Sequence, residues 1–167
     1  LAEPMEVEKA ALALDAALPR GIRVLAADAV DTHHAALMSQ AAGASYRVTL
    51  PYSKDVSAAV AEFNAAPELL FKKAAPKTKA KFKEIDVKFY IPQLTAEQTE
   101  TETIFSFDCK ITPTGSMKAV DLLNALNEQY GLALPVEMAD IERLRLYRNN
   151  KNGKPIPMLN SDAVTLG

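Results

Sequence analysis

The period of the hydrophobic pattern changes repeatedly between residues 46 and 148, and the order of these changes constrains the fold more than any other feature. Alternating apolar and polar residues, typical of strands, occur at 46–50, 85–91, 105–111 and 143–147. Apolar residues spaced three or four positions apart, typical of helices, separate the first pair and the last pair of these segments. The order strand, helix, strand, strand, helix, strand is the β-α-β-β-α-β unit of a ferredoxin-like domain.

The two expected helices have start and stop signals. Ser53 can cap the first helix, and Ser116 can cap the second, which runs to Tyr130 before a left-handed cap at Gly131. The polar, acidic segment 93–103 is expected to be a solvated hairpin loop. The residues expected on the buried helix faces are Val56, Val60 and Phe63 in the first helix and Val120, Leu123 and Leu126 in the second. Elements in this order predict an α+β fold with an antiparallel sheet and both helices on one face.

Three regions are expected along the chain. Residues 1–44 hold a helix and a short strand followed by an Ala-rich connector. A helix and one strand cannot close a core, so this region is expected to be the back half of a larger unit or to pack on the domain that follows. Residues 45–150 form the ferredoxin-like domain. Residues 151–167, with their Asn, Lys, Gly and Pro content, are expected to be a flexible tail.

Composition limits the classes of function. The 167 residues are 49% hydrophobic and 24% charged with a formal net charge of -2, which indicates a globular protein rather than one that coats nucleic acid with its whole surface. The single cysteine, Cys109, excludes an internal disulfide and a metal site built only from thiolates of this chain. Its alternation with Phe105 and Phe107 predicts a buried, inert thiol. No apolar run is long enough to span a bilayer, and we expect a cytoplasmic protein.

The outward positions of the four expected strands decide what the free face of the sheet can bind. They combine basic and aromatic side chains, which can hold phosphates and stack unpaired bases. These outward residues are Arg47, Lys88, Tyr90, Lys110, Arg143, Arg145 and Tyr147. The alternative is that these side chains only solvate an exposed face.

A run of lysines with no acid inside it lies between the first helix and the second expected strand. It comprises Lys72, Lys73, Lys77, Lys79, Lys81 and Lys83. Such a run attracts an anionic backbone by counterion release without reading sequence, although lysines also protect edge strands and fill solvated loops. The candidate nucleic-acid site is this run together with Lys88, Tyr90, Arg143, Arg145 and Tyr147.

No group of residues has the types and spacing of an active site. His33 and His34, with Asp28 and Asp31, could supply metal ligands or a proton-transfer pair, but neighbours in an extended chain point to opposite sides. The turn 114–116 could cradle an anion but lacks the glycine spacing and lysine of a nucleotide loop. We therefore expect no catalytic residue, no metal and no cofactor, and the sequence does not point to an enzyme.

Three stretches carry a family resemblance: residues 16–25 (AALPRGIRVL), 37–50 (LMSQAAGASYRVTL) and 83–87 (KEIDV). They resemble the uncharacterised bacterial radical-SAM-linked protein family, a domain of unknown function whose members are encoded beside, or fused to, a B12-binding radical SAM protein. The resemblance covers most of the chain from Leu1 to Arg148. Family members begin upstream with a Ser-His-Leu-Asp-like motif and a Gly-Phe-Asn-Pro-His-Pro-like loop. This chain has neither, so the resemblance implies that it lacks the family's N-terminal part and that residues 1–44 are the C-terminal part of a first, truncated ferredoxin-like unit plus a connector.

The resemblance implies an accessory role. The paired ferredoxin-like units of the family are similar to RNA-binding proteins of the CRISPR repeat-associated type, which is an analogy of fold. One cysteine cannot hold the radical SAM cluster, so that work falls to the partner. The resemblance thus implies a non-catalytic module that binds or presents RNA, such as tRNA or rRNA, to a radical SAM protein. The alternative is a protein–protein interaction domain that docks on the enzyme with no RNA contact.

Overall fold

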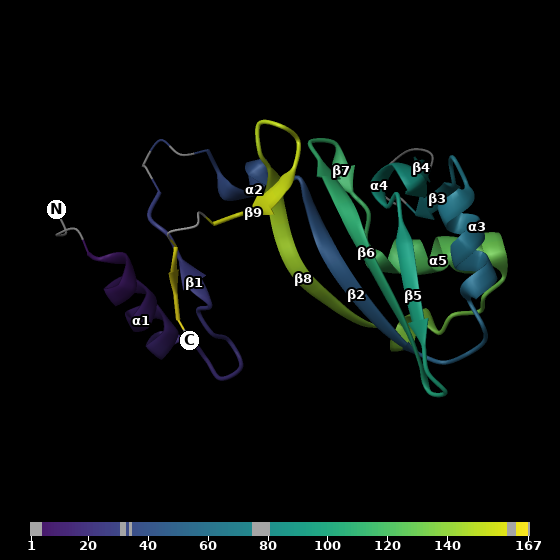
Figure 1. Ribbon diagram of the computed structural model, residues 1–167, viewed down its shortest axis with the longest axis horizontal. Coiled ribbons are helices and arrows are strands. Elements are labelled where there is room, and N and C mark those ends of the chain that lie inside the picture. Colours follow the sequence, from purple (N-terminus) through teal and green to yellow (C-terminus); the bar gives the residue numbers. More distant parts are fainter. Residues whose placement is uncertain (1–4, 31–32, 34, 75–80, 160–162, 167) are drawn as a thin grey trace.

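The chain folds as a mixed α+β protein with antiparallel sheets, as the sequence predicts (Figure 1). The computed structural model describes residues 5–30, 33, 35–74, 81–159 and 163–166. The path through its main sheet is β5-β6-β2-β8-β9, with the short β7 (Gly115–Ser116) paired to β6. The strands on that path are β2 (Gly43–Pro51), β5 (Leu94–Gln98), β6 (Glu102–Thr112), β8 (Asp140–Asn149) and β9 (Pro155–Pro157).

Helices α3 (Ser57–Ala65) and α5 (Ala119–Tyr130) lie on the same side of this sheet (Figure 1). In chain order, β2, α3, β5, β6, α5 and β8 follow the predicted succession of strand, helix, strand, strand, helix, strand. Further elements are inserted between α3 and β5. The ferredoxin-like assignment itself stays a prediction.

The core forms between the helices and the inward face of the sheet. Because successive side chains of a strand point to opposite faces, alternate residues of β6 enter the core. The apolar core residues of the sheet are Val48, Leu50, Leu94, Phe105, Phe107 and Cys109, and those of the two helices include Phe63, Leu122, Leu123 and Leu126. The intervening residues of β6, such as Ser106 and Asp108, point to the opposite face, which α3 and α5 leave open.

The prediction of a strand at 85–91 is wrong in two respects. The strand ends at Asp86, and it does not belong to the main sheet. Phe82–Asp86 form β4, which pairs with β3 (Leu70–Ala74) in a separate two-stranded sheet. Val87–Tyr90 then form the short helix α4, and the Asp86 carboxylate accepts the backbone N–H of Lys88 at 2.9 Å. Val87 and Ile91 are four residues apart, so a helix buries them on one side as readily as a strand would.

The segment 93–103, predicted to be a solvated loop, supplies the edge strand that the sheet needs. Leu94–Gln98 form β5, which pairs with β6 through Leu94 opposite Phe107 and Gln98 opposite Thr103. The link between the two strands shrinks to residues 99–101. Polar side chains suit β5 because it is an edge strand with one face toward solvent.

Both main helices begin later than predicted. The Asp55 carboxylate, and not Ser53, accepts the backbone N–H of Ser57 at the start of α3 (2.9 Å). In α5, Lys118 is the N-cap, and Ser116 belongs to β7. The helix is rotated relative to the prediction, because its buried residues are Ala119, Leu122, Leu123, Ala125 and Leu126 while Val120 is 38% exposed. The left-handed cap at Gly131, with φ of 59°, is confirmed.

Two short strands, one from the N-terminal region and one near the C-terminus, pair beside the main sheet (Figure 1). β1 (Ala26–Ala27) pairs with β10 (Val164–Thr165), and α1 (Val7–Ala17) packs on β1. Within 151–167, the region expected to be a flexible tail, β10 makes this pairing and β9 pairs with β8. The remaining elements are α2 (Leu37–Gln40) and the 3-10 helix η1 (Val136–Met138). In the described part of the chain no helix is long and apolar enough to cross a membrane.

The rotation of α5 gives a matched pair of stability predictions. Leu123→Ala leaves a cavity in the core and is expected to lower the free energy of unfolding by about 2–5 kcal/mol. Val120→Ala, three residues earlier in the same helix, is expected to change it by less than about 1 kcal/mol because its side chain is largely outside the core. Urea unfolding followed by circular dichroism measures both, and an equal loss in the two variants would contradict the placement of this helix.

Candidate nucleic-acid interface

The structure distributes the predicted binding residues over three places. Lys72, Lys73, Lys81 and Lys83 lie on or next to the β3–β4 hairpin, Lys88 and Tyr90 lie on α4, and Arg143, Arg145 and Tyr147 lie on β8. Lys77 and Lys79 lie outside the described residues. The hairpin packs on the helix side of the main sheet, whereas β8 is a strand of that sheet (Figure 1). These residues therefore do not form one continuous basic face.

The hairpin brings two lysines face to face. Lys73 of β3 lies directly opposite Lys83 of β4, one step along the same face from the pair of Phe71 and Ile85, whose side chains pack on the core. We call the hollow beside these lysines the hairpin pocket. It has a volume of about 120 Å³ and is lined by Lys73, Lys83, Ile85, Tyr90, Thr114, Gly115 and Ser116.

The charges of the hairpin pocket are not balanced. Lys73 Nζ donates to Asp121 Oδ2 at 2.6 Å, so one lysine has a counter-charge. Among the described residues, no carboxylate lies within ion-pair distance of Lys83. Like charges directly opposite each other in a strand pair are destabilising, so an anion bound between the two lysines would relieve their repulsion. The small volume of the pocket and the hydroxyl groups of Thr114 and Ser116 suit a phosphate group.

The open face of the main sheet is less basic than predicted. Of the seven predicted outward residues, Arg47, Lys110, Arg145 and Tyr147 lie on this face. Its acids outnumber its bases, because the outward positions also hold Glu97, Asp108, Asp140 and Glu142. Arg47 pairs with Glu142 at 3.8 Å, a distance at which an exposed ion pair contributes little. Lys88 and Tyr90 are absent from the face because 87–90 is a helix.

A β-bulge removes Arg143 from the open face. The register of β2 and β8 shifts so that Arg145 lies opposite Ser45 while Arg143 lies opposite Tyr46. Leu144 is the extra residue, and Arg143 shares the helix side of the sheet with Tyr46. The strict alternation expected at 143–147 is therefore wrong at this point. Bulges often re-aim side chains next to functional sites, and here the bulge presents Leu144 and Arg145 together.

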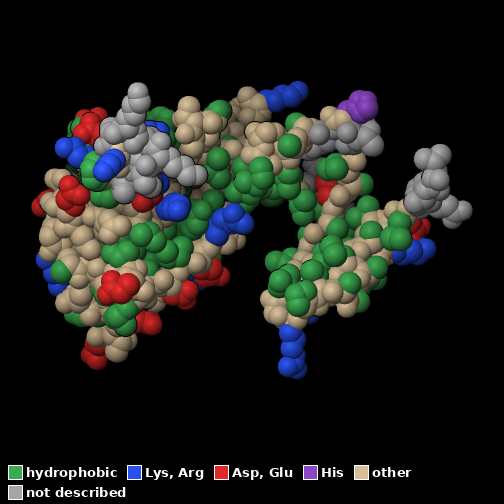
Figure 2. Space-filling model, turned by 180° about the vertical axis from the view of Figure 1, so that it is seen from behind, with side chains coloured by type: hydrophobic (Ala, Val, Ile, Leu, Met, Phe, Trp, Pro, Cys, Tyr) green, Lys and Arg blue, Asp and Glu red, His purple; other side chains and the backbone are tan. Residues whose placement is uncertain are grey.

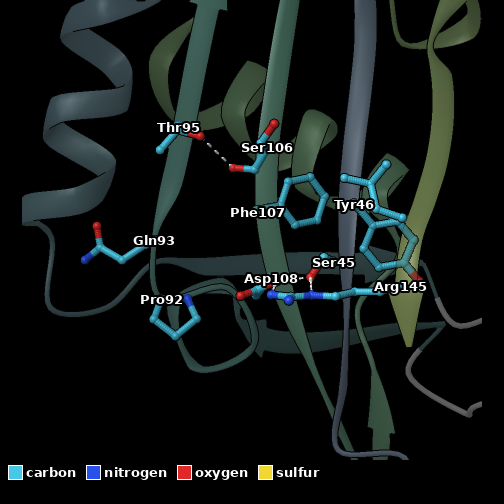
Figure 3. A pocket seen from close by; sticks show the side chains of 10 residues that line it. Ser45, Tyr46, Pro92, Gln93, Thr95, Ser106, Phe107, Asp108 and Arg145 are labelled. Atoms are coloured by element: carbon cyan, nitrogen blue, oxygen red, sulfur yellow. Dashed lines mark hydrogen bonds and ion pairs between the residues drawn. The ribbon is translucent and has the colours of Figure 1, made fainter. Parts of the chain in front are cut away.

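A polar network crosses three strands on the open face (Figure 3). The Ser45 hydroxyl on β2 donates to Asp108 on β6 and accepts the Nε–H of Arg145 on β8 at 2.7 Å. Arg145 Nη2 also lies 3.9 Å from Asp108 Oδ1. Ser45 is only 9% exposed, so both charged side chains are held by a nearly buried hydroxyl.

The ring of Tyr147 covers β2 next to this network. A Cβ added to Gly43 would lie 2.2 Å from the Tyr147 hydroxyl oxygen, so only glycine lets the ring approach the strand this closely. Burial, with a smaller contribution from the charge of Asp108, raises the pKa of the Tyr147 hydroxyl. The Arg145 guanidinium lies over the same ring, 5.8 Å from its centroid.

A wide hollow, which we call the sheet-face pocket, opens beside the Ser45 network (Figure 3). Its volume is about 650 Å³. The lining residues are Ser45, Tyr46, Pro92, Gln93, Thr95, Ser106, Phe107, Asp108, Leu144 and Arg145, drawn from β2, β5, β6, β8 and the segment before β5. Sequence reasoning missed this pocket because it treated 93–103 as a loop and could not detect the bulge.

The two pockets are neighbours across α4. Tyr90 lines the hairpin pocket and Pro92 lines the sheet-face pocket, and two residues along a chain are at most about 7 Å apart. Phe89, beside Tyr90, is 51% exposed, and Lys110 Nζ lies 5.3 Å from its ring centroid. This exposed cation–aromatic pair was also missed, because the predicted strand placed Phe89 in the core. A flexible polyanion with planar bases can follow this route from one pocket to the other.

Lys88 is a structural residue and not part of this route. Its ammonium group donates to the Pro92 carbonyl at 2.6 Å and lies 4.5 Å from the centroid of the Phe63 ring. Burial lowers the pKa of Lys88. These contacts tie α4 to α3 and leave the side chain poorly placed for a ligand.

Among the described residues, no cluster of three or more His, Cys, Asp or Glu side chains is arranged so that it could hold a metal ion. His33 is exposed, while Asp31 and His34 lie outside those residues. Cys109 is buried as predicted, its thiol 3.4 Å from the Met117 carbonyl oxygen. Burial raises the pKa of this thiol.

A family model described as an uncharacterized protein conserved in bacteria (DUF2344) matches residues 1–122. Because this match covers more than half of the chain, the protein belongs to that family. The resemblance to an uncharacterised bacterial family is thus confirmed, while its link to radical SAM proteins stays a prediction. No curated protein and no solved structure matches the chain.

The raised pKa of Cys109 predicts a protected thiol. A thiol with a raised pKa stays protonated at pH 8, where an ordinary cysteine, with a pKa of about 8.5, is already partly thiolate. We expect iodoacetamide to alkylate Cys109 far more slowly in the folded protein than in urea, as measured by intact-mass spectrometry. Equal rates in both states at pH 8 would contradict the burial of this side chain.

Proposed function

We propose that this member of the uncharacterised bacterial family is a non-catalytic module that binds single-stranded RNA and presents it to a partner enzyme. The observation that carries the proposal is the hairpin pocket, where Lys73 and Lys83 face each other and, among the residues that the structure describes, only Lys73 of the two has a carboxylate partner. An anion that binds between them removes a repulsion that the free protein must tolerate. A phosphodiester group fits this charge and this volume.

The neighbouring surface favours an unpaired strand over a duplex. Single-stranded RNA is bound by basic grooves that follow the backbone together with side chains on which exposed bases rest. The exposed ring of Phe89, with Lys110 over it, leads from the hairpin pocket toward the open sheet face. Segments of tRNA or rRNA with splayed bases are the ligands that this arrangement suits.

The proposed partner is a radical SAM protein encoded beside this one, as the family resemblance implies. The single cysteine of the chain is buried, and a radical SAM cluster needs several cysteine ligands. In this scheme the cluster chemistry belongs to the partner, and this chain supplies binding and orientation.

A second candidate function is docking on that partner without RNA. The N-terminal arm, formed by α1, β1 and the segments beside them, exposes large apolar side chains (Figure 2, at the right). Those more than half exposed are Met5, Leu12, Leu14, Ile22, Leu25 and Val30. Apolar side chains gathered on so small a unit favour a protein contact.

The RNA proposal predicts a site-specific loss on removing one lysine. Lys83→Gln is expected to weaken binding of a single-stranded RNA oligonucleotide and to lower the slope of log affinity against log salt by about 0.7, the value for one phosphate contact on a single strand. Fluorescence anisotropy between low and moderate salt measures both. Lys151→Gln, an exposed lysine in the β8–β9 turn, is the matched control and should leave both unchanged.

Two results would contradict the proposal. One is a complete lack of salt-dependent RNA binding by the unmodified chain. The other is an equal effect of the Lys83 and Lys151 substitutions, which would reduce the interaction to net charge. Nuclease-resistant co-purification with the radical SAM protein, combined with absent RNA binding, would favour the docking function.

A further inference from the structure

We propose that the sheet-face pocket is a recognition slot for one unpaired guanine base. This inference deepens the proposed function and rests on it for the class of ligand, a ribonucleotide. It assigns the two pockets different tasks, with phosphate held at the hairpin and base identity read on the sheet.

The shape of the pocket suits a flat ring. Its floor is made of small side chains on neighbouring strands, Thr95 on β5, Ser106 on β6 and Ser45 on β2. Two strand spacings, about 10 Å, separate the first of these strands from the third, which is the width of a purine lying on the sheet. Pro92 at one side and Leu144 at the other are larger apolar side chains that border this floor. The volume of about 650 Å³ lies within the usual range of small-ligand sites.

The charges of the face favour a base over a phosphate. Acidic side chains outnumber basic ones on the outward positions, and Asp108 itself lines the pocket. A carboxylate repels a phosphate group but accepts hydrogen bonds from the donors of a base. The hairpin pocket has the opposite character, since Lys83 has no acidic partner among the residues that the structure describes.

The Ser45 network leaves the groups needed for guanine free to bind. Ser45 engages one carboxylate oxygen of Asp108 and the Nε–H of Arg145. Within the described part of the chain, the other Asp108 oxygen and the two terminal guanidinium nitrogens of Arg145 make no hydrogen bond. More than half of each charged side chain is exposed, so both can reach a ligand.

Guanine is the base whose groups complement this pair best. Its adjacent N1–H and N2–H donors match the Asp108 carboxylate, and its O6 and N7 acceptors match the Arg145 guanidinium. Adenine offers only its single amino group to the carboxylate and has no acceptor in place of O6. Because Ser45 fixes both charged side chains from below, little ordering remains to be done on binding.

The test uses the whole chain and free mononucleotides at moderate salt, which weakens phosphate contacts. Isothermal titration calorimetry is expected to show 5′-GMP binding about tenfold more tightly than 5′-AMP, 5′-CMP or 5′-UMP, the scale of one bidentate base contact. Asp108→Asn should abolish this preference. Glu142→Gln, which removes another carboxylate paired with an arginine on the same face but outside the pocket, should preserve it.

A second variant addresses the shape of the slot. Ser106→Leu fills the floor of the pocket from an outward position. It should eliminate binding of all four nucleotides, while thermal unfolding shows that the fold is retained.

Equal affinity for the four nucleotides, or a guanine preference that survives Asp108→Asn, would overturn the slot. If RNA binding depends on salt and is lost in Lys83→Gln, but the chain shows no preference for 5′-GMP, the slot is overturned and the RNA function stands. A guanine preference without RNA binding would support the slot and overturn the RNA function.

Discussion

The alternation of side chains along β6 is the constraint on which the rest of the structure depends. This strand lies between β5 and β2, and its inward residues Phe105, Phe107 and Cys109 are buried under the helices. The same period sends Ser106 and Asp108 to the face that α3 and α5 leave open. A shift of one residue would bury a carboxylate and expose two phenylalanines, so the register is strongly held. The open face and its polar network follow from that register.

The insertion between α3 and β5 creates the surfaces that set this chain apart from a plain sheet with two helices. The β3–β4 hairpin carries the opposed Lys73 and Lys83, and α4 carries Phe89 to the surface. Both features go against what stability alone would favour, because one opposes like charges and the other exposes an aromatic ring. These features are only partly offset, by the Asp121 carboxylate at Lys73 and the Lys110 ammonium group near Phe89, and such departures from local rules are expected at functional sites. The insertion also contributes to both pockets, because Tyr90 lines the hairpin pocket and Pro92 lines the sheet-face pocket.

Much of the fold could be predicted from the sequence, because long patterns leave little freedom. The alternation in β2 and β6 and the glycine after α5 each admit one interpretation. The segment 85–91 does not, since Val87 and Ile91 satisfy a strand and a helical turn equally, and only the Asp86 cap and tertiary packing decide between them. β5 was missed because an edge strand needs few apolar residues.

The candidate site was harder to predict than the fold. The sequence named Lys73, Lys83 and Arg145 as candidate binding residues, but it could not tell that Asp121 neutralises one of them or that a bulge displaces Arg143. Phe89 was assigned to the inward side of the strand predicted at 85–91, and Ser45 lies just before the strand predicted at 46–50, so neither was a candidate binding residue. Their roles depend on contacts between segments far apart in the sequence.

The central claim is that one RNA strand contacts the hairpin pocket and the sheet-face pocket together. A ¹H–¹⁵N NMR titration of the intact chain with a short single-stranded RNA containing guanine tests it most directly. The amide signals of Lys83 and Ser116, at the hairpin pocket, and of Ser106 and Asp108, on the sheet face, are expected to shift with the same apparent affinity. Shifts confined to the N-terminal arm, or at neither pocket, would contradict it.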